Sequence, residues 1–297
     1  MFRNNNSSGL EYVRTNNNSI LAGEFLNFGL GNLPKSTSIG WNLNTLSYTN
    51  IAFDFSNEGT NNRGIFMNPS GSRLYLLDGQ TVFQYSLVTA DDISSASYDS
   101  KSYTSSELSN GSGVFIKPDG TKMYMTGYGN DTVFQYTLST PWDVSTASYD
   151  TGVNLDISTE DEVPYTLVFS TDGTKMYIPG GVNDTVFQYV LTTPWDLSTA
   201  SYDNKFVDIG SESTSPWGIF FKPDGMKMYI LDFTGHLFQY TLSTPWDVST
   251  ASYDTITKDI TGQATQCNGL WMNQYGNTAY ITTTGGLNSI YQYSLTS

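Results

Sequence analysis

The stretch FQYTLSTPWDVSTASYD occurs twice without a change, at Phe134–Asp150 and at Phe238–Asp254. Its first three letters return in identical or related form at three further places, so the chain carries a fivefold internal repeat. The central glutamines of these words are Gln84, Gln135, Gln188, Gln239 and Gln292, which stand 51, 53, 51 and 53 residues apart. A period near 50 residues is typical of one four-stranded blade of a β-propeller.

The fourth repeat shows how one unit divides into strands. Trp217–Phe221 is apolar and bounded by prolines, which favours a buried innermost strand. The PDG sequence that follows is typical of a tight turn, because proline fixes its own φ and glycine readily adopts a positive φ. Lys227–Leu231 and Leu237–Leu242 have the aromatic and β-branched residues of second and third strands. Thr244–Asp247 predicts one helical turn with the threonine as N-cap, and a fourth strand begins near Ser252.

The last repeat has no sequence for a fourth strand after its FQY-like word. The missing words stand near the front, where Trp41–Tyr48 matches Trp246–Tyr253. We therefore predict an all-β fold, a five-bladed β-propeller with four-stranded blades over residues 41–297. Its ring is closed by an N-terminal strand that completes the last blade, which removes the sheet edges that otherwise invite aggregation.

Residues 1–40 match no part of the repeat and form a separate segment in this division of the chain. One interpretation is a flexible chain terminus without a function of its own. The other is an anchoring arm that docks on a partner, with apolar contact residues at Leu21, Phe25, Leu26 and Phe28. The first residues include one arginine but no apolar run, so we expect no secretory signal.

The composition excludes several classes of function. The net charge is 13 − 28 = −15, which argues against nucleic-acid binding because phosphate contacts need clustered Lys and Arg. No stretch approaches the roughly 18 apolar residues of a transmembrane helix, so we expect no membrane insertion. The single Cys267 and single His236 exclude an internal disulfide and a Cys/His metal site, and no phosphate loop or nucleophile elbow is present.

The repeats differ mainly at one end of the predicted blades, which we call the top face. This face carries the links between consecutive blades and the loops between second and third strands, whereas the PDG turns and TPWD words of the opposite, bottom face are nearly constant. Varied loops on a rigid scaffold are the usual place for binding. Sequence drift without function is the alternative explanation.

One position of the top face is acidic in four repeats and amide in the fifth; its residues are Glu58, Glu107, Glu160, Glu212 and Gln263. The first interpretation is a ring of carboxylates that binds a cation, such as calcium, or ligand hydroxyls. The second is a structural role in which each side chain accepts hydrogen bonds from amides of its own loop. We favour the second, because Gln replaces Glu well as an acceptor but poorly as a calcium ligand. The sequence therefore predicts no cofactor and no metal, with calcium as the alternative.

The position before the inner-strand glycine, which is replaced by Thr166 in the third repeat, also faces the top. It differs in every repeat: Arg63, Ser112, Tyr165, Trp217 and Asn268. We expect Tyr165 and Trp217 to form a stacking surface for a sugar ring. The expected polar partners are Arg63, Asn268, Glu160, Asp161 and Glu162. The alternative is that the two rings plug the channel or pack on a neighbouring blade.

With these words in view, the repeats resemble the FQY-STPWD propeller repeats of marine bacteria and their tailed phages. They are similar, more distantly, to YVTN and lactonase-like propeller repeats, whose inner hairpin reads SPDG-x-x-x-Y, as in Phe221–Tyr229 here. The resemblance covers residues 41–297 and is specific for the fold. It also implies a phage virion protein, which composition and spacing do not show.

We therefore expect a non-enzymatic structural protein of a phage virion, a tail- or head-attached fibre or decoration protein released by lysis. Its propeller would bind host-surface polysaccharide, residues 1–40 would bind other virion proteins, and self-association into a homo-oligomer fits the same role. One alternative is a secreted or cell-surface lectin-like propeller of a bacterium. Another is a five-bladed glycosidase, which needs two carboxylates roughly 5–10 Å apart. The candidates are Asp78, Asp161, Asp232 and the ring of glutamates, but no pair stands out.

Overall fold

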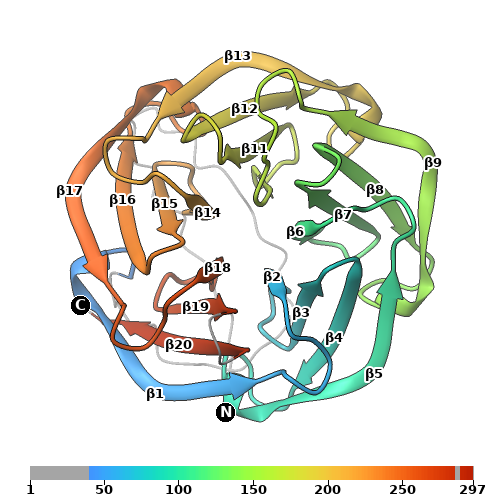
Figure 1. The fold of residues 1–297 in the computed structure, drawn as a ribbon, viewed down its shortest axis with the longest axis horizontal. Helices are drawn as coiled ribbons and strands as arrows, with labels where there is room; N and C mark the ends of the chain where they lie inside the picture. The colour runs from blue at the N-terminus through green and yellow to red at the C-terminus, as the bar shows by residue number, and fades with distance from the viewer. Residues whose placement is uncertain (1–39, 285–287, 297) are drawn as a thin grey trace, which may run out of the picture. The chain divides into compact units, whose positions relative to one another are not determined.

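The computed structural model describes residues 40–284 and 288–296, which form a five-bladed β-propeller (Figure 1). The predicted fold class is confirmed. Each blade is an antiparallel four-stranded sheet whose first strand lies nearest the axis and whose last strand lies at the rim. The apolar residues of the expected N-terminal arm, Leu21, Phe25, Leu26 and Phe28, lie outside the described residues.

The strands of blade 1 are β2 (Asn62–Met67), β3 (Arg73–Asp78), β4 (Thr81–Leu87) and β5 (Ala96–Thr104). Those of blade 2 are β6 (Gly111–Ile116), β7 (Lys122–Gly127), β8 (Thr132–Leu138) and β9 (Ala147–Asp156). Blade 3 has β10 (Val168–Phe169), β11 (Lys175–Gly180), β12 (Thr185–Leu191) and β13 (Ala200–Asp208). Blade 4 has β14 (Pro216–Phe221), β15 (Lys227–Asp232), β16 (His236–Leu242) and β17 (Ala251–Asp259). Blade 5 has β18 (Cys267–Met272), β19 (Thr278–Thr283), β20 (Ser289–Leu295) and β1 (Leu46–Asp54).

The fifth blade joins the two ends of the propeller. β1 pairs antiparallel with β20, from Leu46 opposite Leu295 to Asp54 opposite Ser289. The backbone N–H of Trp41 adds a hydrogen bond to the carbonyl of Gly276, at 3.0 Å. The predicted closure by an N-terminal strand is confirmed, and it leaves the sheet of blade 5 with the same four strands as the others.

Burial falls from the axis to the rim. The inner strand β14 is buried at every residue except Trp217, because it lies between the neighbouring blades. The outer strand β17 alternates between half-buried and exposed residues, since one of its faces meets solvent. This difference explains why inner strands have continuous apolar sequences and outer strands have alternating ones.

Aromatic side chains from four inner strands meet around Trp271. Its ring centroid lies 4.6 Å from that of Phe66, 5.1 Å from that of Phe220 and 6.4 Å from that of Phe115. These residues come from blades 5, 1, 4 and 2, so their contact places them at the axis of the ring. The centre of the propeller is therefore packed with aromatic side chains.

A single 3₁₀ turn precedes each outer strand: η1 (Leu43–Thr45), η2 (Ile93–Ser95), η3 (Val144–Thr146), η4 (Leu197–Thr199) and η5 (Val248–Thr250). The predicted start of this turn at Thr244 is wrong, because Trp246 has a φ of 59°, which a right-handed helix cannot include. The N-cap is Asp247, whose carboxylate accepts from the N–H of Ser249 at 3.2 Å. No helix within residues 40–284 and 288–296 is long and apolar enough to cross a membrane.

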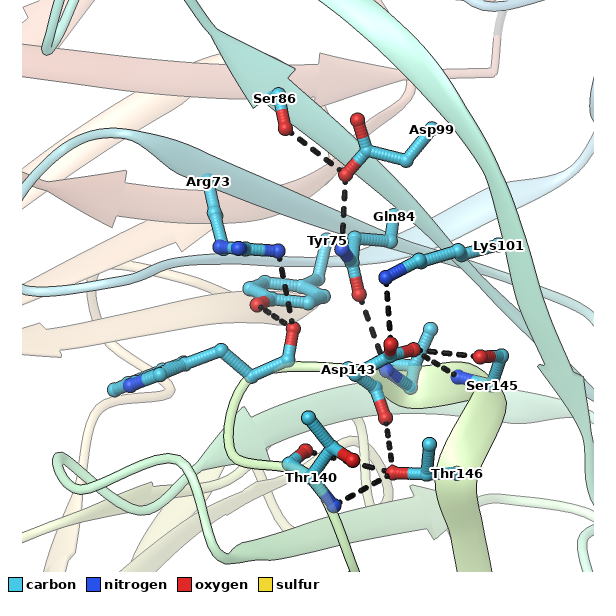
Figure 2. Close-up of polar contacts among 12 residues, drawn as sticks. Arg73, Tyr75, Gln84, Ser86, Asp99, Lys101, Thr140, Asp143, Ser145 and Thr146 are labelled. Carbon is cyan, nitrogen blue, oxygen red and sulfur yellow. Dashed lines mark hydrogen bonds and ion pairs between the residues drawn. The ribbon is translucent and has the colours of Figure 1, made fainter.

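The glutamines of the five FQY-type words tie each blade to the next. In blade 1, Gln84 accepts from the backbone N–H of Val144 in blade 2 at 3.1 Å and donates to Asp99 of its own blade at 2.8 Å (Figure 2). The equivalent bonds join Gln135 to Leu197, Gln188 to Val248, Gln239 to Leu43 and Gln292 to Ile93. The series returns to blade 1, so the glutamines form a closed ring of contacts.

Tyrosines of the second strands form a parallel ring. Tyr75 donates to the carbonyl of Trp142 at 2.9 Å (Figure 2). The equivalent bonds join Tyr124 to Trp195, Tyr177 to Trp246, Tyr229 to Trp41 and Tyr280 to Asp91. The indoles also cover the glycines of the PDG turns, since a Cβ on Gly120 would lie 2.6 Å from the Trp142 ring. These tryptophans serve packing, and Asp91 takes their place in blade 1.

Removing the closing strand is expected to destroy the fold. A chain that starts at Ser56 lacks β1, leaves the seven residues of β20 as an open edge, and removes the partners of Gln239 and Tyr229. We expect it to form aggregates in size-exclusion chromatography. A chain that starts at Gly40 keeps β1 and serves as the control; we expect a monodisperse protein with cooperative thermal unfolding. Equal behaviour of the two chains would contradict the closure.

Replacing one ring glutamine is expected to lower stability. Gln188→Leu leaves the buried N–H of Val248 without its acceptor and Asp203 without its amide donor. The expected loss is about 1–3 kcal/mol in the free energy of unfolding, measured by denaturant titration. Gln263→Leu, at an exposed glutamine of an inter-blade link, is the matched control and should change stability by less than about 0.5 kcal/mol.

Candidate functional site

A cavity of about 440 Å³ opens on the top face where the inner strands begin. Its wall combines the aromatic rings of Tyr128, Tyr165, Trp217 and Phe233 with the polar side chains of Thr60, Asn61, Arg63, Gln266, Asn268 and Thr284, and with Val163. These residues come from inter-blade links, from the first residues of inner strands and from loops between second and third strands. The cavity is therefore assembled by all five blades.

Bulges at the start of the inner strands point side chains toward the cavity. In β14, pairing with β15 jumps from Pro216 to Gly218, which leaves Trp217 without a partner on the second strand. The same register shift leaves Arg63 and Asn268 unpaired at the starts of β2 and β18. A β-bulge turns a side chain out of the regular alternation, so these residues can reach the mouth.

The glycine after each bulge is required by close packing of the blades. A Cβ on Gly218 would lie 2.9 Å from the Cβ of Leu270, which belongs to the inner strand of the next blade. A Cβ on Gly269 would lie 2.9 Å from the side chain of Ile65 across the next inter-blade contact. Because the inner strands approach this closely, the large bulged side chains of Arg63 and Trp217 extend to the cavity wall.

Tyr165 and Trp217 stack on each other across the boundary of blades 3 and 4. Their ring centroids are 4.2 Å apart with an angle of 22° between the planes. Phe233 extends the stack on the side of Trp217, with a centroid distance of 5.5 Å. The two rings thus pack across neighbouring blades, as the alternative proposed, and they also line the cavity. That they stack on a sugar stays a prediction.

Arg63 lies against two of the aromatic rings. Its Cζ is 4.7 Å from the ring centroid of Tyr128 and 5.3 Å from that of Trp217, which are cation–π distances. Its Nε donates to the side-chain oxygen of Asn61 at 3.3 Å. Arg63 is the one charged side chain among the described residues that line the cavity.

Amide and hydroxyl groups complete the wall. The hydroxyl of Thr284 donates to the Oδ1 of Asn268 at 2.9 Å, so the amide nitrogen of Asn268 is not used in that contact. The indole N–H of Trp217 donates to Ser215 at 3.0 Å, which holds the ring in place. Ser112, the equivalent residue of blade 2, is fully buried and donates to the carbonyl of Pro164 at 2.9 Å, so it does not reach the cavity.

The three acidic residues expected as polar partners lie outside the lining. Asp161 is buried, and its carboxylate accepts from the backbone N–H groups of Val163 and Asn183 at 2.7 and 3.0 Å. Glu160 accepts from the hydroxyl of Tyr189, and Glu162 is exposed. The structure thus brings together Tyr165, Trp217, Arg63 and Asn268, and it leaves out Glu160, Asp161 and Glu162.

The per-blade acidic residues contact the last tyrosine of the FQY words. Glu58, Glu160 and Glu212 accept from Tyr85, Tyr189 and Tyr240 at 3.3, 3.3 and 3.2 Å. Glu107 accepts from Ser105, which in turn contacts the Tyr136 hydroxyl. In the fifth blade Gln263 is exposed, and the buried Tyr293 hydroxyl has no partner among the described residues. The donors are tyrosine and serine hydroxyls, not the loop amides that we expected.

The protonation of these tyrosines explains the direction of the bonds. Burial, together with the Glu160 carboxylate, raises the pKa of Tyr189 far above its ordinary value of 10. Tyr189 therefore stays a hydroxyl donor at neutral pH, and Glu160 stays its acceptor. Within the described ranges no three His, Cys, Asp or Glu side chains gather in a group that fits a metal ion.

The aspartates that we named as glycosidase candidates each accept hydrogen bonds from groups of the top-face loops. Asp78 accepts from the backbone N–H of Asn61 at 2.5 Å, and Asp232 accepts from the Ser213 hydroxyl at 2.6 Å. Neither these two nor Asp161 lines the cavity. The sole cysteine, Cys267, is also buried, and burial raises the pKa of its thiol to about 12, which keeps it protonated and unreactive.

Sequence reasoning missed several lining residues, of which Tyr128 and Phe233 are the largest. Both stand in the varied loops between second and third strands, and each is the one aromatic residue of its loop. An aromatic residue in a varied top-face loop was therefore the sequence signal that could have identified both as lining residues.

A smaller, mostly apolar hollow of about 170 Å³ lies at the other end of the inner strands, lined by Trp195, Trp246 and Trp271 among others.

Of the comparisons with known proteins, the one with solved structures gave matches. No family model and no curated protein matches the sequence. The chain is similar to a protein of unknown function from Desulfotomaculum acetoxidans, with 13% identity and a TM-score of 0.47 over 75% of this chain and 62% of that one. It is also similar to a proposed 6-phosphogluconolactonase from Bacteroides uniformis, with 11% identity and a TM-score of 0.49 over 74% and 62%. This chain spans less than two thirds of the length of either structure.

A substitution at Glu160 separates the structural role from cation binding. Glu160→Gln keeps an oxygen acceptor for Tyr189 and should change the free energy of unfolding by less than about 1 kcal/mol, whereas Glu160→Leu should cost about 1–3 kcal/mol. Thermal unfolding with and without calcium checks both variants. Calcium that raises the melting temperature of the parent protein, but not of Glu160→Gln, would contradict the structural role.

Proposed function

We propose that this protein is a non-enzymatic propeller that presents a carbohydrate-binding cavity on its top face. The observation that carries the proposal is the cavity wall, in which the Tyr165–Trp217 stack stands beside amide and hydroxyl groups at the mouth of the ring. Sugars combine apolar C–H surfaces with many hydroxyls. Aromatic rings bury the former, and amide groups both donate to and accept from the latter.

The size and shape of the cavity fit a ligand of few sugar units. Its volume of about 440 Å³ lies within the range of about 300–1,000 Å³ that is usual for small-molecule pockets. Tyr165, Trp217 and Arg63 are half-buried, so each combines a fixed position with a surface that a ligand can touch. A preformed wall limits the ordering cost of binding.

The lining supports binding rather than glycoside hydrolysis at this place. A glycosidase needs two carboxylates across the pocket. The described lining contains none, and Asp78, Asp161 and Asp232 are held by groups of their own loops. These contacts favour the non-enzymatic alternative.

The placement of the protein in a phage virion is supported by the resemblance of its repeats to those of tailed phages. In this proposal the propeller is the displayed head of a fibre or decoration protein, and residues 1–40 attach it to other virion proteins. Closure by β1 gives each of the five described blades four strands, so β20 is paired and is not left as an open edge. Detection of the chain in purified particles by mass spectrometry tests this placement.

Trp217 is the residue of choice to test the carbohydrate site. Trp217→Ala removes the ring that contacts Tyr165, Phe233 and Arg63, so glycan-array binding should fall at least tenfold. Tyr275→Ala removes an aromatic ring that is 62% exposed and outside the cavity lining, and it should bind as the parent does. Both variants are first checked for unchanged secondary structure by circular dichroism.

The array gives a clear outcome in either direction. Binding that is lost in Trp217→Ala and kept in Tyr275→Ala supports a glycan-binding head. Binding that both variants keep would move the site elsewhere on the propeller. Absence of binding by the parent protein to glycans and to intact bacterial cells would overturn the proposed function.

A further inference from the structure

We propose that the cavity selects an acidic sugar, whose carboxylate or sulfate group pairs with Arg63. The inference rests on the proposed function and names the class of its ligand. It starts from one contrast: the chain has a net charge of −15, yet the one charged side chain among the described residues that line the top cavity is cationic.

The position of Arg63 is fixed before any ligand arrives. The bulge in β2 directs it out of the strand, and its guanidinium lies against the rings of Tyr128 and Trp217. The Nε contact to Asn61 sets its orientation. An arginine held at three points loses little further side-chain freedom on binding, so the cost of ordering it has already been met by folding.

Arg63 keeps hydrogen-bond donors for an anion. A guanidinium has five N–H groups, and the structure uses the one on Nε. The described residues supply Arg63 with no carboxylate within ion-pair distance, whereas six lysines of the same chain pair with aspartates: Lys101, Lys117, Lys122, Lys205, Lys222 and Lys227. Arg73, the other arginine among the described residues, donates from its terminal nitrogen to the carbonyl of Trp142, whereas the terminal N–H groups of Arg63 have no acceptor among the described residues. A guanidinium placed in this way on the cavity wall can pair with an external anion.

The faces of the aromatic rings point to the same conclusion. One face of the Trp217 ring is taken by Tyr165, and Phe233 and Arg63 also contact the indole. These contacts occupy part of the Trp217 ring, so a sugar that stacks there gains less apolar contact than it would on a free ring. The guanidinium N–H groups, by contrast, are strong directional donors. The charge-assisted contact is therefore the main polar anchor.

The nearest neutral polar groups complete a site for a sugar rather than for a bare anion. Asn61 bonds directly to Arg63, and the amide nitrogen of Asn268 and the hydroxyl of Thr60 line the same wall. An acidic sugar presents hydroxyls next to its charged group. One end of the ligand would pair with Arg63, and its hydroxyls would bond to these amides.

The experiment compares matched glycans on the parent protein and on variants at Arg63. The probes are glucuronate-bearing, sulfated and neutral glucose-bearing oligosaccharides with the same backbone. We expect the parent to prefer one of the acidic probes to the neutral one. Arg63→Gln should weaken binding of that acidic probe about 10- to 100-fold and leave the neutral probe within about twofold. Arg63→Lys should recover only part of the loss, since an ammonium lacks the planar fork.

Lys258→Gln is the matched control. It removes the same single charge from the half-buried outer strand β17, away from the cavity lining, and should leave all binding unchanged. The preference for the acidic probe should also weaken as salt rises in the parent protein but not in Arg63→Gln. The glucuronate and sulfate arms show which anionic group is used.

The outcomes distinguish a failure of the acidic-sugar inference from a failure of the proposed carbohydrate-binding function. Neutral and acidic probes that bind equally, with Arg63→Gln unchanged, would overturn the acidic-sugar inference and leave the carbohydrate site standing. Failure of every probe to bind would overturn both. Thermal unfolding of Arg63→Gln confirms that any loss of binding arises in a folded propeller.

Discussion

The bond from each ring glutamine to the next blade is the contact on which the rest of the propeller depends. Gln84 shows how it works (Figure 2): the amide oxygen accepts from the first N–H of a 3₁₀ turn in blade 2, and the amide nitrogen donates to an aspartate in its own blade. The first N–H groups of a helical turn have no partner inside the turn. A buried glutamine satisfies one of them while its own donor is also satisfied, so neither blade can shift without leaving buried polar groups unpaired.

The same constraint shapes the mouth of the ring. Five bonds of 2.9–3.1 Å hold neighbouring blades together. Their inner strands lie so close that a Cβ at Gly64, Gly218 or Gly269 would meet the next blade. The bulge before each of these glycines directs Arg63, Trp217 and Asn268 to the cavity wall. The cavity is thus a consequence of tight inter-blade packing, and its chemistry is set by residues that the packing leaves free to vary.

The sequence predicted the parts that depend on local pattern. The repeat spacing and the displaced WNLNTLSY words were sufficient for five blades and for closure by β1, because strand propensity and turn residues act within one repeat. The meeting of Arg63, Tyr165, Trp217 and Asn268 followed from their shared place in the repeat. Tyr128 enters the cavity from a loop whose conformation depends on its neighbours. The 3₁₀ turns begin later than expected because the residue before each N-cap, a tryptophan in four turns and Asp91 in the other, has a positive φ. Such features depend on contacts between repeats, which periodicity does not encode.

The contrast between a symmetric scaffold and an asymmetric mouth indicates how many ligands the propeller holds. Equivalent sites on five blades would need equivalent side chains, yet the five equivalent positions near the starts of the inner strands hold an arginine, a serine, a tyrosine, a tryptophan and an asparagine. Arg63 contacts residues of blades 2 and 4, so its surroundings exist once in the ring. The ligand site that we propose therefore occurs once in each propeller. A protein with one site per chain gains avidity only through several copies on one particle, since linked sites multiply weak affinities without new contacts. In the proposed function, display of many propellers on one virion would supply that avidity.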